Sequence, residues 1–150
     1  TISGTGEAGF ADIALLDANG VRVDVVEVGS NVTLEITVDV KKPISRLVLG
    51  FMIKDRMGQA MYGVNTHRLH SPLENLVSGE RIVYRFAFPV NLGKGNYSIA
   101  LSLSRFDSHL DTNYEWRDYA LLFHVINMKK PDFIGCAALD VSLDIDRLSS

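Results

Sequence analysis

Apolar residues recur at every second position in four separate stretches of this chain. The clearest is 32–40, where Val, Leu and Ile alternate with Thr, Glu and Asp, and the same spacing covers 82–88, 97–103 and 119–125. A period of two sends alternate side chains to opposite faces of a β-strand, so each stretch predicts a strand with one buried and one solvated face. Several such strands at short spacing predict an all-β fold, an antiparallel β-sandwich of the immunoglobulin-like or jelly-roll kind.

The whole chain divides into about nine predicted strands and no long helix. The predicted strands are 11–16, 21–26, 32–40, 47–54, 60–65, 81–90, 96–106, 116–128 and 133–145. The stretch 66–79 lacks the period of two and predicts a surface loop. Pro131 is the best hinge candidate, because proline fixes φ and removes a ladder donor. The last strand, about 133–145, would then pack on its own sandwich or be exchanged with a second protomer.

Length and charge exclude several classes of protein. The 150 residues, 47% hydrophobic and 22% charged, fit one globular domain over 1–150. The net charge is −3 and basic runs stop at two residues, as at Lys41-Lys42. Nucleic-acid binding and polybasic membrane docking are therefore not expected. A single cysteine, Cys136, permits no internal disulfide and favours the cytoplasm. The missing initiator Met suggests a domain taken from a longer protein.

The solvated faces of the predicted strands suggest a binding site. Strand 96–106 presents small hydroxylated residues opposite its apolar stripe, and strand 116–128 presents the only tryptophan, Trp116, opposite the stripe that runs from Tyr119 to Val125. An indole stacks on the apolar face of a sugar ring, while carboxylate and guanidinium groups suit its hydroxyls. We therefore expect a carbohydrate site made of Trp116, Tyr114, Arg85, Arg117, Asp118, Ser102 and Ser104. Strict alternation turns Arg117 away from Trp116, and only a bulge would bring it back.

Other interpretations of the same residues remain open. The serine face is also what a solvated outer face looks like, and arginine and glutamate on neighbouring strands also form ordinary cross-strand pairs. Glu35, Glu115 and Asp118 would supply the paired carboxylates of a glycan-processing enzyme if they met in one cleft. A flat apolar face would instead indicate a protein–protein interaction module.

Metal and cofactor motifs are weak or missing. His67-x-x-His70 has no evident third ligand, so no metal is expected. The run from Asp107 to Asp111 contains the letters of a catalytic triad, but triads assemble across a fold rather than within five residues. The chain has no G-x-x-x-x-G-K-[ST] phosphate loop, so no cofactor is expected.

An ordered set of turn motifs resembles a known family. The chain is similar to the C-terminal carbohydrate-binding domain of the nucleotide-binding subunit of O-antigen polysaccharide ABC exporters, the Wzt type. The residues that carry the resemblance are Gly4-Thr-Gly6-Glu-Ala8, Asp17-x-x-Gly20, Gly50-Phe-x-Ile53-x-Asp55-x-x-Gly58, Tyr62-Gly-x-Asn65-Thr66, Leu92-Gly-x-Gly95-x-Tyr97 and Phe133-x-Gly135.

This resemblance implies a non-catalytic role in the cytoplasm, at the inner face of the membrane. It implies binding of lipid-linked O-polysaccharide before export and selection of the glycan to be exported. It also implies a homodimer and two further partners, a membrane transporter subunit and the protein's own N-terminal ATPase domain. ATP would bind only in that ATPase domain, outside this chain. The family's glycan contacts follow no short motif, so the predicted site residues rest on the strand faces alone.

Overall fold

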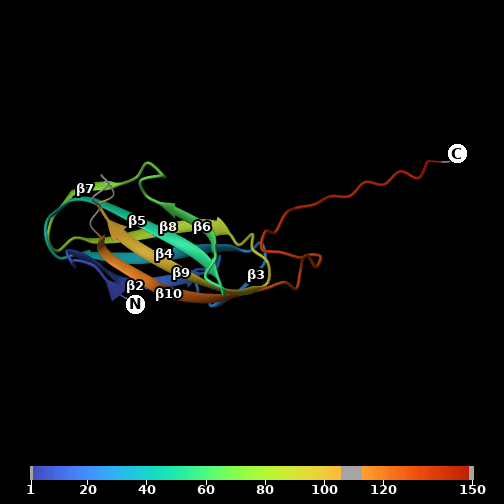
Figure 1. Cartoon of the computed structure of the whole chain (residues 1–150), viewed down its shortest axis with the longest axis horizontal. Coiled ribbons are helices and arrows are strands. Elements are labelled where there is room, and N and C mark those ends of the chain that lie inside the picture. Colours follow the sequence, from blue (N-terminus) through green and yellow to red (C-terminus); the bar gives the residue numbers. More distant parts are fainter. Residues whose placement is uncertain (1, 106–112, 149–150) are drawn as a thin grey trace.

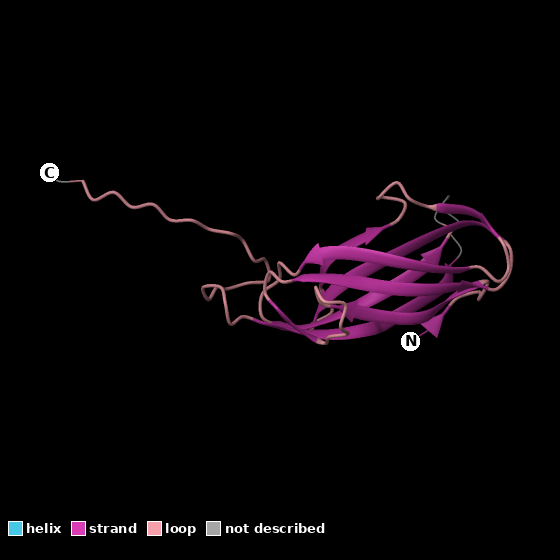
Figure 2. Ribbon diagram, turned by 180° about the vertical axis from the view of Figure 1, so that it is seen from behind, coloured by secondary structure: helices cyan, strands magenta, loops and turns pink. Residues whose placement is uncertain are grey.

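The computed structural model describes residues 2–105 and 113–148, and all regular structure within these ranges is β-strand (Figures 1 and 2). The strands are β1 (Ile2–Ser3), β2 (Ala8–Leu16), β3 (Val25–Glu27), β4 (Asn31–Val40), β5 (Ile44–Asp55), β6 (Ala60–Asn65), β7 (Leu73–Leu76), β8 (Arg81–Pro89), β9 (Gly95–Ser104) and β10 (Asn113–Ile126). The predicted all-β class is confirmed. In this part of the chain no helix has the length and hydropathy needed to span a bilayer.

Two sheets pack face to face. The larger sheet has the order β1-β10-β9-β5-β6, with β3 paired to β10 and β7 paired to β5, and the smaller sheet has the order β2-β4-β8. Neighbouring strands are antiparallel except for the short β3–β10 pair, which is parallel. Both predicted features, antiparallel pairing and a sandwich, are therefore confirmed.

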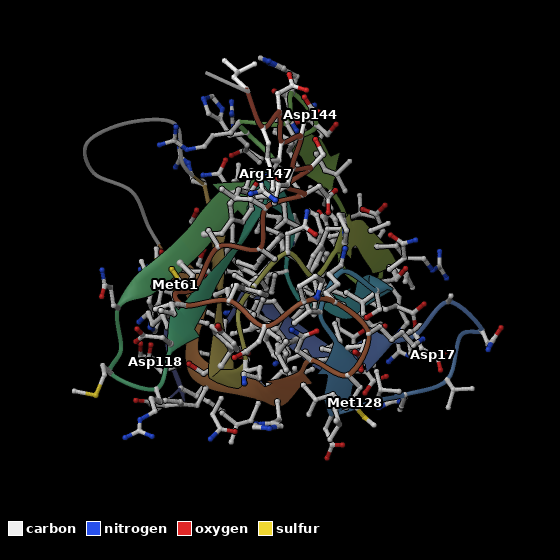
Figure 3. All side chains as sticks on the ribbon, turned by 90° about the vertical axis from the view of Figure 1, so that its right-hand side faces the viewer. Asp17, Met61, Asp118, Met128, Asp144 and Arg147 are labelled. Atoms are coloured by element: carbon white, nitrogen blue, oxygen red, sulfur yellow. The ribbon has the colours of Figure 1, made fainter. Side chains whose placement is uncertain are left out.

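The core is the space between the sheets, which side chains fill in the end-on view (Figure 3). The smaller sheet contributes the fully buried Leu34 and Ile36 of β4, and the larger sheet contributes Leu49, Ile99 and Leu101 of β5 and β9. These residues occupy alternate positions, as the period of two predicts. Predicted strand 47–54 is indeed central, because β5 pairs with β6, β7 and β9.

Two predictions about irregular segments are wrong. The predicted loop 66–79 contains a strand, β7, whose four residues pair with the start of β5. Four residues are too few for a period of two to stand out in the sequence. Predicted strand 21–26 is also wrong in extent, because the segment forms only an isolated bridge between Arg22 and Leu16 and the short β3 at Val25–Glu27. The polar loop predicted around 107–111 lies outside the described residues.

The predicted last strand does not form within a single copy of the chain. Ala138 N donates to Asn91 O at 3.1 Å, which is the last backbone hydrogen bond between this segment and the body among the described residues. Beyond it the chain runs away from the sandwich (Figure 1). Leu139, Val141 and Leu143 are about four-fifths exposed. The chain leaves the body after Ala138 rather than at the predicted hinge Pro131, because beyond that proline Gly93 N still donates to Cys136 O and Ala138 N to Asn91 O.

Candidate functional site

The side of the larger sheet that faces away from the core, here called the outer face, carries most of the site. Pairing places Asn65, Gly50, Ser102 and Trp116 in one row across β6, β5, β9 and β10. Residues that pair in a sheet project from the same face. Because Leu101 and Leu103 of β9 are buried in the core, the row that contains Ser102 projects outward.

A shallow hollow lies along this row. It measures about 410 Å³, and we call it the Trp116 hollow. Its outward-facing side chains come from all four strands and the turn after β6: Met52, Asn65, Arg68, Ala100, Ser102 and Trp116. Trp116 is partly exposed, so one aromatic ring borders a space that also offers a hydroxyl, an amide and a guanidinium.

Two glycines keep the hollow open. An added Cβ at Gly50 would lie 2.9 Å from Ser102 Oγ, and one at Gly63 would lie 3.4 Å from Met52 Cε. Any side chain at Gly50 would therefore occupy the floor beside Ser102. The lack of a side chain there creates room at the centre of the row.

Asp118 fixes the indole on the outer face. Trp116 Nε1 donates to Asp118 Oδ1 at 3.1 Å, and Lys54 Nζ lies 3.9 Å from the same oxygen. Lys54 belongs to β5 and Asp118 to β10, so the ion pair crosses β9, which lies between them. Both side chains are partly exposed, so the pair itself adds little stability, but it limits the rotation of the tryptophan ring.

A second hollow of about 390 Å³, the Tyr119 hollow, lies further along the outer face. Tyr119 was predicted to point inward with the apolar stripe of β10, and this prediction is wrong. Its ring is 71% exposed and its φ is +49°. The register of β10 against β9 shifts between Arg117 and Leu121, and this bulge turns Tyr119 out.

The structure brings together only three of the seven residues predicted for the site: Trp116, Asp118 and Ser102. Ser104 projects from the same face but is 7% exposed. Tyr114 is 4% exposed, packs in the core and donates its hydroxyl to Arg46 O at 2.9 Å. The expectation that Tyr114 forms a second stacking platform is therefore wrong, because its ring has no free face.

The two predicted arginines lie elsewhere. Arg117 is on the opposite face of β10 from Trp116, where its guanidinium contacts Glu115 Oε2 at 2.7 Å and lies 5.6 Å from the centre of the Phe10 ring. The bulge follows Arg117 and so does not turn it back. Arg85 is in the smaller sheet and pairs with Glu35 across the β4–β8 register, with Nε to Oε2 at 2.8 Å. It forms the cross-strand pair that was the alternative interpretation.

The carboxylates considered for glycan cleavage do not meet. Glu35 belongs to the smaller sheet, and Glu115 accepts from Phe10 N at 3.1 Å on the face of β10 opposite Asp118. His67 does not form a metal site with His70, since its Nδ1 lies 2.7 Å from Arg46 Nη2. Within the described ranges no three His, Cys, Asp or Glu side chains gather as metal ligands do.

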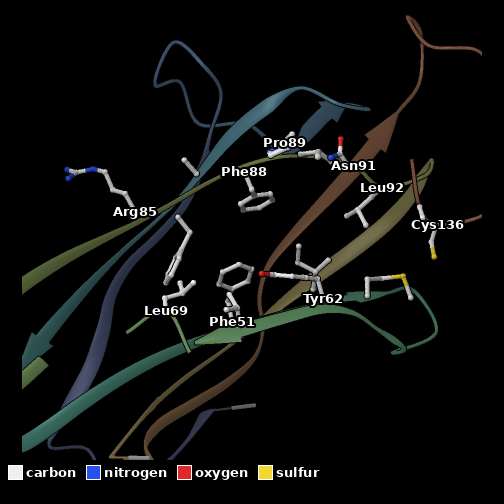
Figure 4. Close-up of a pocket in the computed structure, with 16 residues that line it drawn as sticks. Phe51, Tyr62, Leu69, Arg85, Phe88, Pro89, Asn91, Leu92 and Cys136 are labelled. Atoms are coloured by element: carbon white, nitrogen blue, oxygen red, sulfur yellow. The ribbon is translucent and has the colours of Figure 1, made fainter. Parts of the chain in front are cut away.

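A larger, apolar cleft opens between β6 and β8, at the edge where the two sheets part. This edge cleft measures about 670 Å³. Phe51 and Phe88 stack across it with ring centres 6.0 Å apart, and Tyr62 lies at its mouth (Figure 4). The guanidinium of Arg85 points away from it (Figure 4). Its lining suits apolar side chains rather than sugar hydroxyls.

Sequence reasoning missed Met52, Asn65, Arg68 and Tyr119. Asn65 belongs to a motif that carried the resemblance, but nothing in the motif indicates its direction. Met52 stands opposite Phe51 and Ile53 in a strand that is apolar on both faces, so its outward position has no local signal. Arg68 lies in the segment after β6, where alternation does not apply.

Comparisons with known proteins agree with the fold. The family model described as the Wzt C-terminal domain matches residues 1–139. Among solved structures, the chain is similar to the crystal structure of the C-terminal domain of wzt, with a TM-score of 0.83 and 25% identity over 96% of this chain and 87% of that one. A β-glucosidase, EmGH1 from Erythrobacter marinus, matches with a TM-score of 0.44 and 11% identity over 79% of this chain and 15% of that one, too slight a likeness to carry an argument. No curated protein matches the sequence.

Proposed function

Because the chain belongs to the family of Wzt C-terminal domains, which takes part in O-antigen export, we propose that it binds the lipid-linked O-polysaccharide and selects which glycan is exported. The observation that carries this proposal is the position of Trp116. The indole lies outside the core, borders an open hollow and stands in one row with a serine and an asparagine.

The chemistry of the Trp116 hollow suits a pyranose. One face of such a ring is a patch of C–H groups, which packs on the face of an indole. The hydroxyls around the ring find an amide in Asn65, a guanidinium in Arg68 and a hydroxyl in Ser102. Shallow sites of this kind bind a single sugar weakly and gain strength along a polymer. A domain that retains a long polysaccharide needs no deeper pocket.

The domain contributes binding rather than catalysis. It belongs to a non-catalytic family, and the three candidate carboxylates lie on different faces. We infer that it works in the cytoplasm, beside the membrane subunit of the transporter and joined to an ATPase domain that precedes it. ATP would act at that domain, and no cofactor is proposed for this one.

The proposed test is affinity electrophoresis through gels that contain purified O-polysaccharide. Trp116→Ala should lose its retardation, because one aromatic stacking contact is worth about 0.5–1.5 kcal/mol and the loss repeats along the polymer. Tyr62→Ala is the matched control, since it removes an exposed aromatic ring from the edge cleft. O-polysaccharide of a different repeat structure serves as the negative ligand.

The outcomes distinguish the Trp116 hollow from the edge cleft. Unchanged retardation of Trp116→Ala, with an unchanged unfolding temperature, would contradict the proposal. Loss of retardation in Tyr62→Ala alone would place the sugar in the edge cleft instead.

We also propose that the domain is a homodimer held by its C-terminal segment. Leu139, Val141, Leu143 and Ile145 alternate with polar residues and are at least two-thirds exposed. An alternating segment with no strand beside it is suited to pair with the edge of another sheet. The segment leaves the body beside the edge cleft, where β8 is an edge strand of the smaller sheet.

A further inference from the structure

Tyr119 adopts a backbone conformation that aromatic residues rarely keep. Its φ of +49° lies in the left-handed region, which disfavours any side chain with a Cβ. Between Arg117 and Leu121 the strand β10 advances four residues while β9 advances two, from Leu101 to Ile99. The two extra residues form the bulge, and its effect is to present the Tyr119 ring to solvent. Strain at such a position persists where the surrounding structure imposes it, and it often marks a functional site.

The Tyr119 hollow resembles the Trp116 hollow in its chemistry. Each has an aromatic ring that is at least partly exposed and a guanidinium among its lining side chains. Each also has a serine of β9, although Ser98 of the second hollow is only 7% exposed. The polar side chains that line the Tyr119 hollow are Asp24, Asp55, Arg56, Asn96, Ser98 and His124. Asn96 Oδ1 lies 2.7 Å from His124 Nδ1, so those two groups are already held in place.

Both hollows open on the same face and share the same floor strand. Ser102 borders the first hollow and Ser98 borders the second. Four residues of β-strand span about 13 Å. Lys54 pairs with Ser98 and so belongs to the row of the second hollow, but its side chain reaches across β9 to Asp118. Asp118 lies in β10 between Arg117, opposite Leu101, and Leu121, opposite Ile99, so this ion pair lies between the two hollows. A ligand that reaches both must pass over this ion pair. One sugar ring is too small to do so, but a segment of a polysaccharide is long enough.

We propose that Tyr119 is a second stacking platform and that the two hollows bind two separated sugars of one polysaccharide strand. This inference rests on the proposed function and makes it more specific. The binding unit is then an oligosaccharide segment rather than a single sugar. Linking two weak contacts through one ligand raises the overall affinity, because the second contact forms within the complex.

The experiment compares the wild-type domain with Tyr119→Asn and Tyr119→Phe. Asparagine tolerates a positive φ and removes the ring, and phenylalanine keeps the ring. Binding is measured by titration calorimetry with fragments of the O-polysaccharide of increasing length and with the intact polymer, and thermal unfolding is followed in parallel. Trp116→Ala is carried through the same series.

Tyr119→Asn should unfold at the wild-type temperature or above it and bind the long fragments about two- to tenfold more weakly, the worth of one aromatic contact. Fragments too short to reach both hollows should bind the variant as they bind the wild type. Tyr119→Phe should behave as wild type throughout.

Two outcomes would overturn the inference while the proposed function stands. The first is wild-type affinity of Tyr119→Asn for every fragment when Trp116→Ala has lost binding. The second is an equal loss in Tyr119→Asn for short and long fragments, which would indicate one site rather than two. Wild-type affinity of Trp116→Ala would instead overturn the proposed function itself.

Discussion

The indole N–H of Trp116 donates to the carboxylate of Asp118, two residues further along the same face of β10, at 3.1 Å. The same carboxylate oxygen lies 3.9 Å from Lys54 Nζ on the far side of β9. The ring that we propose as the sugar platform is therefore held from two strands before any ligand arrives. An ordered platform loses less conformational entropy when a ligand binds.

Replacing Asp118 tests whether this hydrogen bond positions the ring. Asp118→Ala should weaken polysaccharide binding by about fivefold, the worth of one ordinary hydrogen bond. Asp118→Asn keeps an acceptor for the indole but loses the charge that faces Lys54, so it should bind nearly as wild type. Calorimetric titration of both variants with the polysaccharide measures the difference. Equal losses in the two variants would assign the effect to charge rather than to the position of the indole.

Filling the floor of the Trp116 hollow should reduce binding without harming the fold. In Gly50→Ala the new methyl group lies 2.9 Å from Ser102 Oγ, which rotates or shifts to make room. The hollow then becomes shallower beside the indole, and affinity for the polysaccharide should fall several-fold. Gly50 lies within a strand and alanine loses less entropy on folding, so the unfolding temperature should not fall. Unaltered affinity would show that the sugar does not approach this floor.

Tyr84 gives a prediction about stability and pH. Its hydroxyl oxygen is buried and has no hydrogen-bond partner among the described residues, and burial raises the pKa of Tyr84 to about 12. Tyr84→Phe should raise the free energy of unfolding at neutral pH by about 1 kcal/mol, because it removes an unsatisfied buried group. Denaturant titration measures this change.

The raised pKa also predicts the direction of the pH effect. The unfolded chain releases the tyrosine proton near pH 10, as model tyrosine does, and the folded chain releases it near pH 12. The contribution of this pKa difference to the free energy of unfolding is therefore fully present below about pH 10 and is lost as the pH rises toward 12. Tyr84→Phe should show a smaller loss over this range. Some loss remains, because burial also raises the pKa of Tyr97. Identical slopes in wild type and variant would contradict this assignment.

Removing residues 139–150 tests the proposed dimer. These residues start just beyond the hydrogen bond from Ala138 N to Asn91 O. The shortened chain should sediment as a monomer and unfold at the wild-type temperature at low protein concentration. Asp144→Ala, a change at a polar position of the same segment, should remain a dimer. A wild-type chain that sediments as a monomer at every concentration would refute the proposal.

The buried faces of the strands were predictable because they depend only on local alternation. The stripe from Val32 to Val40 lies inside the sandwich as expected, and β6 has the predicted bounds. Alternation also placed Trp116, Asp118 and Ser102 on outward faces. Whether a side chain faces the core or solvent follows from the polarity of its neighbours one and two residues away.

The alternation of apolar and polar residues does not indicate which sheet a strand joins. Arg85 and Trp116 both face outward, but they do so from opposite layers of the sandwich. Tyr119 faces outward because β10 gains two residues relative to β9, and a bulge depends on the partner strand rather than on the strand itself. Tyr114 lies inside because the register of β10 against β9 also shifts between Asn113 and Glu115, and its hydroxyl there donates to Arg46 O.

The two short strands beside β10 have a consequence for self-association. β1 pairs with Trp116 and Arg117, and β3 pairs with His124 to Ile126, so the margin of the larger sheet is covered at both ends. The bulge at Tyr119 occupies the interval between them. A long straight margin with unpaired amides invites strands from other molecules, and bulges and short strands prevent such addition. The border of the sandwich at β10 is therefore protected against the addition of strands from other molecules. Association between copies is left to the opposite border, where β6 and β8 are the edge strands.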